Sequence, residues 1–235
     1  MTRSVRMMRS GGRTVGFVLT ISALSLSVGP VAVRAASAGT EAALAGEAFA
    51  SGHLPEAERL YDKALARAQA GTPETVTATL LVNAAAVKTR LGKIEDSRQL
   101  LRKAVSIDMD NKAAWLLSGM NALDRSEDEE AFADLARAVL LDPSNPRAHN
   151  YLGIAAGRKG WTEASESELR RAVELDPGYA DANFNLAVLY LGRKPPLAEL
   201  ARRHYQRALD LGLPRDPAVD KLLSQATRNP ETPAP

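Results

Sequence analysis

No cysteine occurs in the 235-residue sequence, and its absence excludes several kinds of protein and of site. Without thiols the chain can form no disulfide, bind no metal through thiolates, use no thiol nucleophile and carry no lipid on a cysteine. The stability of the fold must therefore come from packing alone.

Aromatic residues are also scarce, at 5% of the sequence, and strand-type alternation of Val, Ile and Thr is nearly absent. Strands favour those residue types, whereas Ala and Leu, which are abundant here, favour helices. The hydrophobic fraction of 45% is large enough for a sizeable core. This composition predicts an all-α fold, in one domain or one short repeat array.

Acidic residues are missing before Glu41, in a region where four arginines precede an apolar run from Val15 to Val28. A positive start, a short apolar middle and an exit of small residues are typical of a secretory signal. We therefore expect residues 1–38 to be a signal peptide that is cleaved after Ala35 or Ala38. The protein would then be a bacterial, exported protein, located in the periplasm or secreted.

An uncleaved membrane anchor formed by residues 15–33 is the alternative to a signal peptide. The uninterrupted run is shorter than the ~20 apolar residues that cross a bilayer, and Gly29-Pro30 interrupts any longer helix. Both observations favour cleavage. An anchored protein would instead be held at the inner membrane.

The basic residues of this segment also bear on possible partners. Loss of residues 1–38 removes five arginines and no acid, so the formal net charge of +2 falls by five, to −3. A nucleic-acid partner requires a concentrated basic surface. We therefore expect no nucleic acid among the partners.

A spaced pattern of small and apolar residues occurs five times between residues 57 and 208. The copies end at Ala64, Ala104, Ala138, Ala172 and Ala208, at intervals of 40, 34, 34 and 36 residues. Upstream of the copies lie stripes at spacings of three and four, such as His149, Leu152, Gly153 and Ala156. Residues at these spacings share one side of a helix. Each unit is therefore predicted to be a helical hairpin.

An Asp-Pro pair ends two of these units, at Pro143 and Pro177. Proline cannot continue a helical hydrogen-bond ladder and disfavours the helical conformation in the residue before it. The small residues, such as Gly153, are predicted where the two helices of a hairpin cross closely. One such hairpin encloses no core, so we expect each to be stable only when stacked on its neighbours.

The spacing resembles the tetratricopeptide repeat, whose pattern is W-x2-L-G-x2-Y, A-x3-F and Pro at a period of 34. The resemblance implies a right-handed α-α superhelix, or solenoid, of about five repeats, with Met109 replacing the proline of the second unit. The predicted organisation is an array over 39–214, with units at about 38–71, 78–111, 112–145, 146–179 and 180–214. A capping helix is expected at 215–227, beginning with Asp216 and Pro217, and a disordered tail at 228–235.

We find no sequence motif for catalysis, for a cofactor or for a metal ion. The three histidines, His53, His149 and His204, fall in three different units and form no His-Glu-x-x-His pair. The acidic run from Ser126 to Phe132 coincides with a predicted helix start, where carboxylates favour the helix dipole. The sequence therefore favours a protein that is not an enzyme.

The resemblance also implies a concave groove, lined by the first helices of successive units, that binds an extended peptide or another protein. Carried over position by position, its lining would be Val82, Asn83, Ala86, Leu116, Met120, Asn150, Ile154, Arg158, Phe184, Asn185, Val188 and Leu191. Most are apolar, and Asn side chains can pair with a peptide backbone. Where a carboxylate clamp would need a basic residue and an Asn, this chain has Ala42 and Gly46, or Val82 and Ala86, so no such clamp is expected.

The sequence thus predicts a scaffold of the cell envelope that binds a protein or peptide segment, with self-association or mutual covering of the apolar residues as another use of the same surface. The first alternative is a membrane-anchored factor that assembles an envelope or secretion complex. An envelope enzyme is the second alternative.

Overall fold

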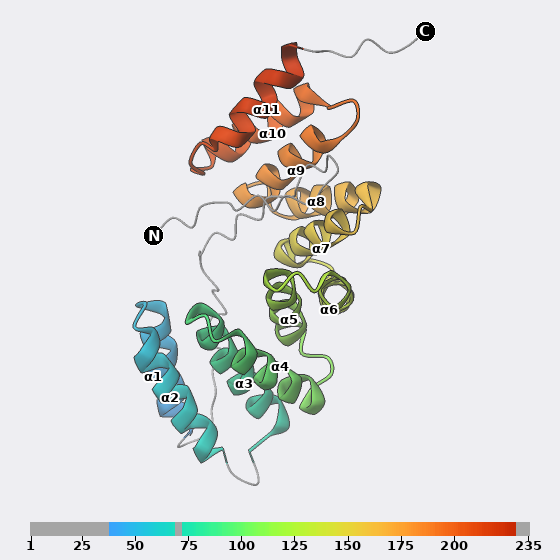
Figure 1. Ribbon diagram of the computed structural model, residues 1–235. Helices are drawn as coiled ribbons and strands as arrows, with labels where there is room; N and C mark the ends of the chain where they lie inside the picture. The colour runs from blue at the N-terminus through green and yellow to red at the C-terminus, as the bar shows by residue number, and fades with distance from the viewer. Residues whose placement is uncertain (1–37, 69–71, 229–235) are drawn as a thin grey trace. The chain divides into compact units, whose positions relative to one another are not determined.

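The computed structural model describes residues 38–68 and 72–228, and within these ranges every regular element is an α-helix (Figure 1). The predicted all-α class is therefore confirmed. The predicted signal segment, apart from its last residue, and the end of the predicted tail lie outside the described residues. None of the described helices is both long enough and apolar enough to cross a membrane.

The described chain divides into two compact units at Asp142 and Pro143. The N-terminal unit contains α1 (Ala38–Ala50), α2 (Leu54–Arg67), α3 (Glu74–Arg90), α4 (Ile94–Ile107), α5 (Lys112–Asp124) and α6 (Asp128–Leu141). The C-terminal unit contains α7 (Pro146–Arg158), α8 (Thr162–Leu175), α9 (Ala180–Gly192), α10 (Ala198–Asp210) and α11 (Pro217–Arg228). Each unit is described by itself below.

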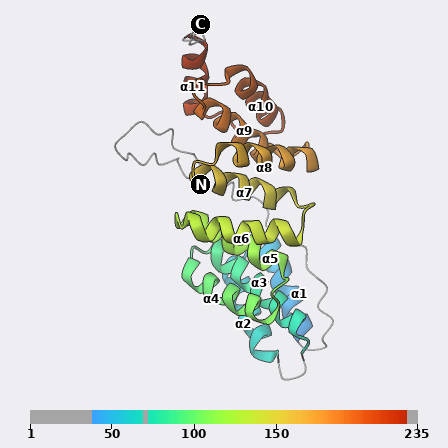
Figure 2. The ribbon, with the colours of Figure 1, turned by 90° about the vertical axis from the view of Figure 1, so that its right-hand side faces the viewer.

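Consecutive helices pair into antiparallel hairpins, and the hairpins stack within each unit (Figures 1 and 2). The pairs are α1 with α2, α3 with α4, α5 with α6, α7 with α8, and α9 with α10. The second helix of a hairpin also contacts the first helix of the next, as α2 contacts α3, α4 contacts α5 and α8 contacts α9. The first helices α3, α5 and α9 are therefore each covered by two second helices within their stacks.

In two of the hairpins, a glycine lies where the two helices of the hairpin cross and allows them to approach closely. A Cβ atom added to Gly119 would lie 2.5 Å from the Leu135 Cγ atom, and one added to Gly153 would lie 2.7 Å from the Leu169 Cγ atom. Both distances are shorter than any van der Waals contact. The small residues that the repeat pattern requires at these two positions are thus explained by the packing of α5 on α6 and of α7 on α8.

Three of the helices that precede turns between hairpins, α4, α6 and α8, end at an aspartate with φ between −134° and −142°. Asp142 has φ −142° and Asp176 has φ −139°, as expected for residues that precede proline. Asp108 adopts the same conformation, with φ −134°, although Met109 follows it. Its Oδ1 accepts a hydrogen bond from the Asp110 backbone N, as Asp176 Oδ1 does from Gly178 N. The aspartate, and not only the proline, therefore ends the helix.

The turns inside four of the hairpins contain a residue in the left-handed region. It is glycine at Gly52, Gly92 and Gly160, where φ lies between 76° and 78°, whereas the α5–α6 turn uses Ser126 at φ 61°. The predicted helix start after Ser126 is shifted slightly, since α6 begins at Asp128 with Glu127 in the N-cap position. The three acidic residues of the first turn of α6 then lie at the positive end of that helix.

Helix α11 closes the C-terminal stack. Asp216 caps it, because its Oδ1 accepts hydrogen bonds from Ala218 N at 2.7 Å and Val219 N at 3.3 Å. Val219 and Leu223 are buried in one apolar cluster with side chains of α9 and α10. Asp216 is thus the N-cap of α11, and this helix covers the last hairpin.

Candidate functional site

Eight of the twelve residues predicted to line a groove are buried, and the other four are half-buried. The buried residues are Val82, Ala86, Asn150, Ile154, Phe184, Asn185, Val188 and Leu191. The half-buried ones are Asn83, Leu116, Met120 and Arg158. The structure therefore does not present the twelve side chains as one open apolar surface.

In the N-terminal unit, Val82 and Ala86 of α3 are covered by the hairpin that follows. They belong to an apolar cluster with Ala114 and Leu117 of α5, and their exposed fractions are 2% each. These two positions, which the family resemblance assigns to a groove, therefore pack one hairpin against the next. These two side chains contribute to stacking in this unit.

In the C-terminal unit the corresponding residues of α7 and α9 are also used in packing. Asn185 Nδ2 donates a hydrogen bond to Asn150 Oδ1 at 2.9 Å, which links the two first helices. Phe184, whose exposed fraction is 3%, lies edge-on to the Tyr205 ring, with ring centroids 6.2 Å apart. Phe184, together with Val188 and Leu191, lies in the cluster that α11 completes.

Leu116 and Met120 differ from these residues because they remain partly exposed. They lie four positions apart on α5, so they share one side of the helix. Helix α5 is the last first helix of the N-terminal unit. Of the predicted lining, Leu116 and Met120 are the apolar side chains that the structure leaves accessible.

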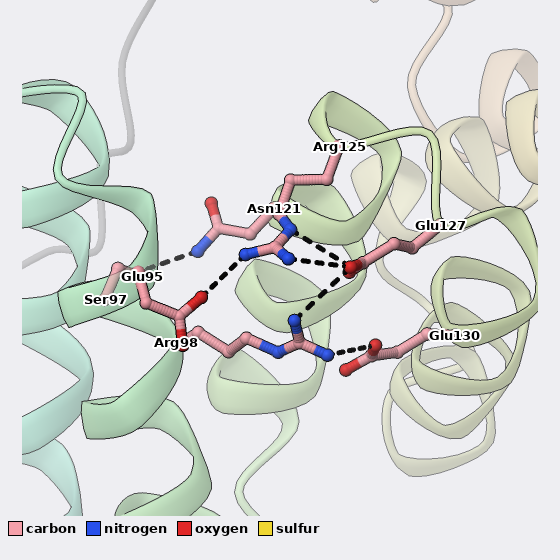
Figure 3. A network of polar contacts seen from close by, with 7 residues as sticks. All are labelled: Glu95, Ser97, Arg98, Asn121, Arg125, Glu127 and Glu130. Carbon is pink, nitrogen blue, oxygen red and sulfur yellow. Dashed lines mark hydrogen bonds and ion pairs between the residues drawn. The ribbon is translucent and has the colours of Figure 1, made fainter.

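A network of polar side chains joins α4 to the α5–α6 hairpin (Figure 3). Arg98 pairs with Glu127 at 3.3 Å and with Glu130 at 2.5 Å, while Arg125 pairs with Glu95 at 2.7 Å and with Glu127 at 2.8 Å. The Arg98 side chain is only 18% exposed. Two cations thus share the Glu127 carboxylate, and the network binds consecutive hairpins together.

A buried group of neutral polar side chains lies beside this network. Asn121 Nδ2 donates to Ser97 Oγ at 2.9 Å, and Thr89 Oγ1 lies 2.8 Å from the same Ser97 oxygen and 3.1 Å from Asn121 Oδ1. The three residues come from α3, α4 and α5. The sequence analysis did not predict this group. The one available signal was Ser97, a polar residue at a repeat position where three other copies have alanine.

A further ion pair group joins the first two hairpins. Glu58 of α2 accepts hydrogen bonds from Lys88 at 2.8 Å and from Lys93 at 2.7 Å. These two hydrogen bonds lower the pKa of the Glu58 carboxyl. The arrangement again connects neighbouring hairpins, which is a structural role.

The three histidines belong to three different hairpins, and none of them forms an arrangement with other titratable groups that is suited to catalysis. His53 is exposed in the α1–α2 turn. His149 Nδ1 lies 2.6 Å from Glu168 Oε2, and its Nε2 lies 3.0 Å from the Pro143 carbonyl oxygen. His204 Nδ1 lies 3.0 Å from Asn183 Oδ1. The buried ring of His149 and the half-buried ring of His204 thus each link the two helices of one hairpin.

Among the residues that the structure describes, no three His, Asp or Glu side chains come together as ligands for a metal ion. Two surface hollows lie along α2 and α8. Both are lined mainly by charged side chains, and neither includes a residue of the predicted groove.

A family profile described as "Tetratricopeptide repeat" matches residues 42–111, 116–180 and 150–212. No functionally curated protein matches the sequence.

Several solved structures share the fold at low sequence identity. PilF of Pseudomonas aeruginosa has a TM-score of 0.68 and 17% identity, over 83% of this chain and 86% of that one. MamA from Desulfovibrio magneticus RS-1 has a TM-score of 0.62 and 18% identity, over 76% and 97%. YrrB, described as a TPR protein with an unusual peptide-binding site, has a TM-score of 0.57 and 24% identity, over 79% and 89%. These likenesses support the fold.

Two serines at the same register allow a test of the buried polar group. Ser97 and Ser165 are both fully buried, but Ser165 Oγ has no hydrogen-bond partner. Ser97→Ala should lower the free energy of unfolding by about 1–3 kcal/mol, because the Asn121 amide loses its acceptor. Ser165→Ala should leave it unchanged or raise it by up to about 1 kcal/mol. Urea unfolding followed by circular dichroism measures both; equal losses in the two variants would contradict a stabilising role of the Ser97 group.

His204 predicts a loss of stability in mild acid. Burial, together with the charges of Arg203 and Arg170, lowers the pKa of His204 below its ordinary value of 6.5. The unfolded chain therefore binds the proton more readily, so this contribution is complete above pH 6.5 and is lost as the pH falls below it. The slope from one group is at most about 1.4 kcal/mol per pH unit.

The variant His204→Gln keeps an N–H donor for Asn183 but does not titrate. Its free energy of unfolding, measured in urea at pH 7.5 and pH 5.5, should therefore change less with pH than that of the unaltered protein. Every other titratable group is common to the two proteins, so its contribution to the pH dependence cancels in the comparison. Identical pH dependences would show that His204 does not contribute.

Proposed function

Because the chain belongs to the tetratricopeptide repeat family, we propose that it is a non-enzymatic scaffold that binds a segment of another protein. The family match covers residues 42–111 and 116–212, which includes every hairpin of both units. Stacked hairpins of this kind expose long surfaces and enclose no deep catalytic cleft. The proposal therefore places the function in a surface and not in a chemical step.

The partial exposure of Leu116 and Met120 is the observation that supports this proposal most directly. In α3 and α9 the residues at the matching positions, such as Val82 and Phe184, are covered by the following hairpin or helix. Exposed apolar side chains at neighbouring turns of a helix gain free energy when a partner removes them from water. We therefore assign the partner segment to the side of α5 that carries Leu116 and Met120.

YrrB, which shares the fold, is described as having a peptide-binding site. That description supports a peptide or protein segment as the class of partner for this chain as well. The partner segment would be partly apolar, because the accessible side chains of the predicted lining are Leu and Met.

A substitution on α5 tests this surface. Met120→Glu places an unpaired charge on the proposed contact surface, where its desolvation opposes binding. We expect at least about a tenfold lower recovery of bound proteins when tagged Met120→Glu replaces the tagged unaltered chain in affinity purification from the native cells, followed by mass spectrometry. Helicity, measured by circular dichroism, should be retained because the side chain is half-buried.

Met109→Glu is the matched control, since Met109 is 70% exposed in the α4–α5 turn and lies outside the proposed surface. Recovery with this variant should equal that with the unaltered chain. If Met120→Glu recovers the same proteins in the same amounts, α5 does not carry the contact. Phe184 is unsuitable for this test, because a charge at its buried position would unfold the last hairpin.

The sequence upstream of the array supports a location in the cell envelope. An arginine-rich start followed by an apolar run is typical of export. We propose a cleaved, periplasmic or secreted scaffold. The competing proposal is a factor anchored by residues 15–33 that assembles an envelope complex.

Fractionation of the native cells, with sequencing of the mature N-terminus, separates these two proposals. A scaffold released by cleavage is expected in the soluble envelope fraction and should begin at Ala36 or Gly39. An anchored factor would be recovered from the membrane with residues 15–33 intact. Recovery from the cytoplasm with Met1 still in place would contradict both.

A further inference from the structure

Two exposed apolar side chains occupy matching places at the tips of the hairpins in the C-terminal unit. Trp161 and Leu197 are the N-cap residues of α8 and α10, and neither side chain caps its helix. Their exposed fractions are 46% and 37%. In the N-terminal unit the same positions hold His53, Lys93 and Glu127. Helix N-caps prefer Ser, Thr, Asp or Asn, so folding does not account for Trp and Leu here.

Further apolar residues extend this surface. Pro195 and Pro196 are exposed in the α9–α10 turn, and Leu200, 39% exposed, lies in the first turn of α10. We name the five residues Trp161, Pro195, Pro196, Leu197 and Leu200 the tip patch. Contiguous exposed apolar surface on a folded protein commonly marks an interaction site.

Arg193 holds the two hairpin tips together. Its guanidinium pairs with Glu166 and, at 3.8 Å, with Glu163, both in the first turns of α8 close after Trp161. Tyr190 OH donates to the same Glu166, and the Tyr190 carbonyl accepts a hydrogen bond from Leu197 N. The chain that carries Leu197 is therefore fixed to the start of α8, and the tip patch is one surface and not two separate residues.

Positive charge surrounds the tip patch. The Lys159 ammonium lies 4.8 Å from the centre of the Trp161 ring, and Lys194 is exposed in the α9–α10 turn. Residues 193–203, which span part of this turn and the first half of α10, contain four basic residues and one acid, Glu199. The positive ends of α8 and α10 lie at the same edge, since each helix begins there. The charge of this edge is complementary to an acidic partner.

We propose that the tip patch is a second interaction surface, which binds an acidic segment of another protein carrying two apolar side chains. The expected partner segment therefore carries two apolar residues flanked by Asp or Glu. This surface belongs to the C-terminal unit, whereas α5 belongs to the N-terminal unit, and it extends the proposed scaffold to a second partner.

The test uses a fluorescein-labelled peptide, Asp-Asp-Leu-Asp-Asp-Leu-Asp-Asp, titrated with the full chain and followed by fluorescence anisotropy. We expect saturable binding that weakens as salt is raised, because charged groups contribute to it. Leu197→Ser and Trp161→Ser should each weaken binding by about tenfold or more. Serine is a favourable N-cap, so the unfolding midpoint of both variants should not fall, and lost binding cannot be ascribed to unfolding.

Two controls make the result specific. Leu44→Ser removes an apolar side chain of similar exposure, 48%, from α1 of the N-terminal unit and should change the affinity by less than about twofold. A peptide in which both Leu are replaced by Ser should bind at least about tenfold more weakly. The proposal is overturned if the parent peptide does not bind, if either serine variant binds it unchanged, or if the Ser-containing peptide binds equally well.

A second copy of this chain is the competing occupant of the tip patch. Sedimentation velocity at increasing protein concentration detects such self-association. Dimers that Leu197→Ser abolishes would overturn the acidic partner in favour of a second copy.

The outcome for α5 is independent, because the Met120→Glu comparison does not involve the peptide. If the peptide does not bind but Met120→Glu lowers protein recovery, the tip patch alone is rejected. If the peptide binds but Met120→Glu leaves protein recovery unchanged, the α5 surface alone is rejected.

Discussion

A helical hairpin of this chain cannot enclose its own apolar residues, and this constraint shapes both units. Leu135 and Leu169 fill the space against Gly119 and Gly153 inside their hairpins. The opposite side of each first helix then needs cover from the next hairpin, as Val82 and Ala86 receive from α5. Stacking is therefore required for stability, and surfaces for partners can form only where stacking leaves apolar residues uncovered.

This constraint also explains which parts of the structure the sequence could predict. Helices and their ends follow from local chemistry, such as the Asp-Pro pair at Asp176 and the cap at Asp216, so they are visible in the sequence. The family resemblance predicted the position of lining residues along α9, but it could not separate cover by α11 from exposure to a partner. Phe184 and Met120 look alike in the repeat register, and only the three-dimensional packing distinguishes them.

Polar groups inside the stack were harder to predict, because their roles depend on partners from other hairpins. Ser97 and Ser165 share a register, yet Ser97 meets Thr89 and Asn121 whereas Ser165 Oγ meets no acceptor or donor. The difference arises from the neighbouring hairpins and not from the serines. Ser126 is a similar case, since its left-handed conformation is imposed by a turn that three other hairpins make with glycine.

Function in such an array is therefore best sought at positions that stacking does not determine. The crossing glycines and the residues that face the next hairpin are fixed by packing, and variation there reports on stability. The N-cap residues at the hairpin tips are free of that requirement, because a polar cap would serve the helix better than Trp161 or Leu197 does. Trp161 and Leu197 are exposed at two such tips, which Arg193 joins, and a bound partner is the explanation that their exposure and surrounding charge support.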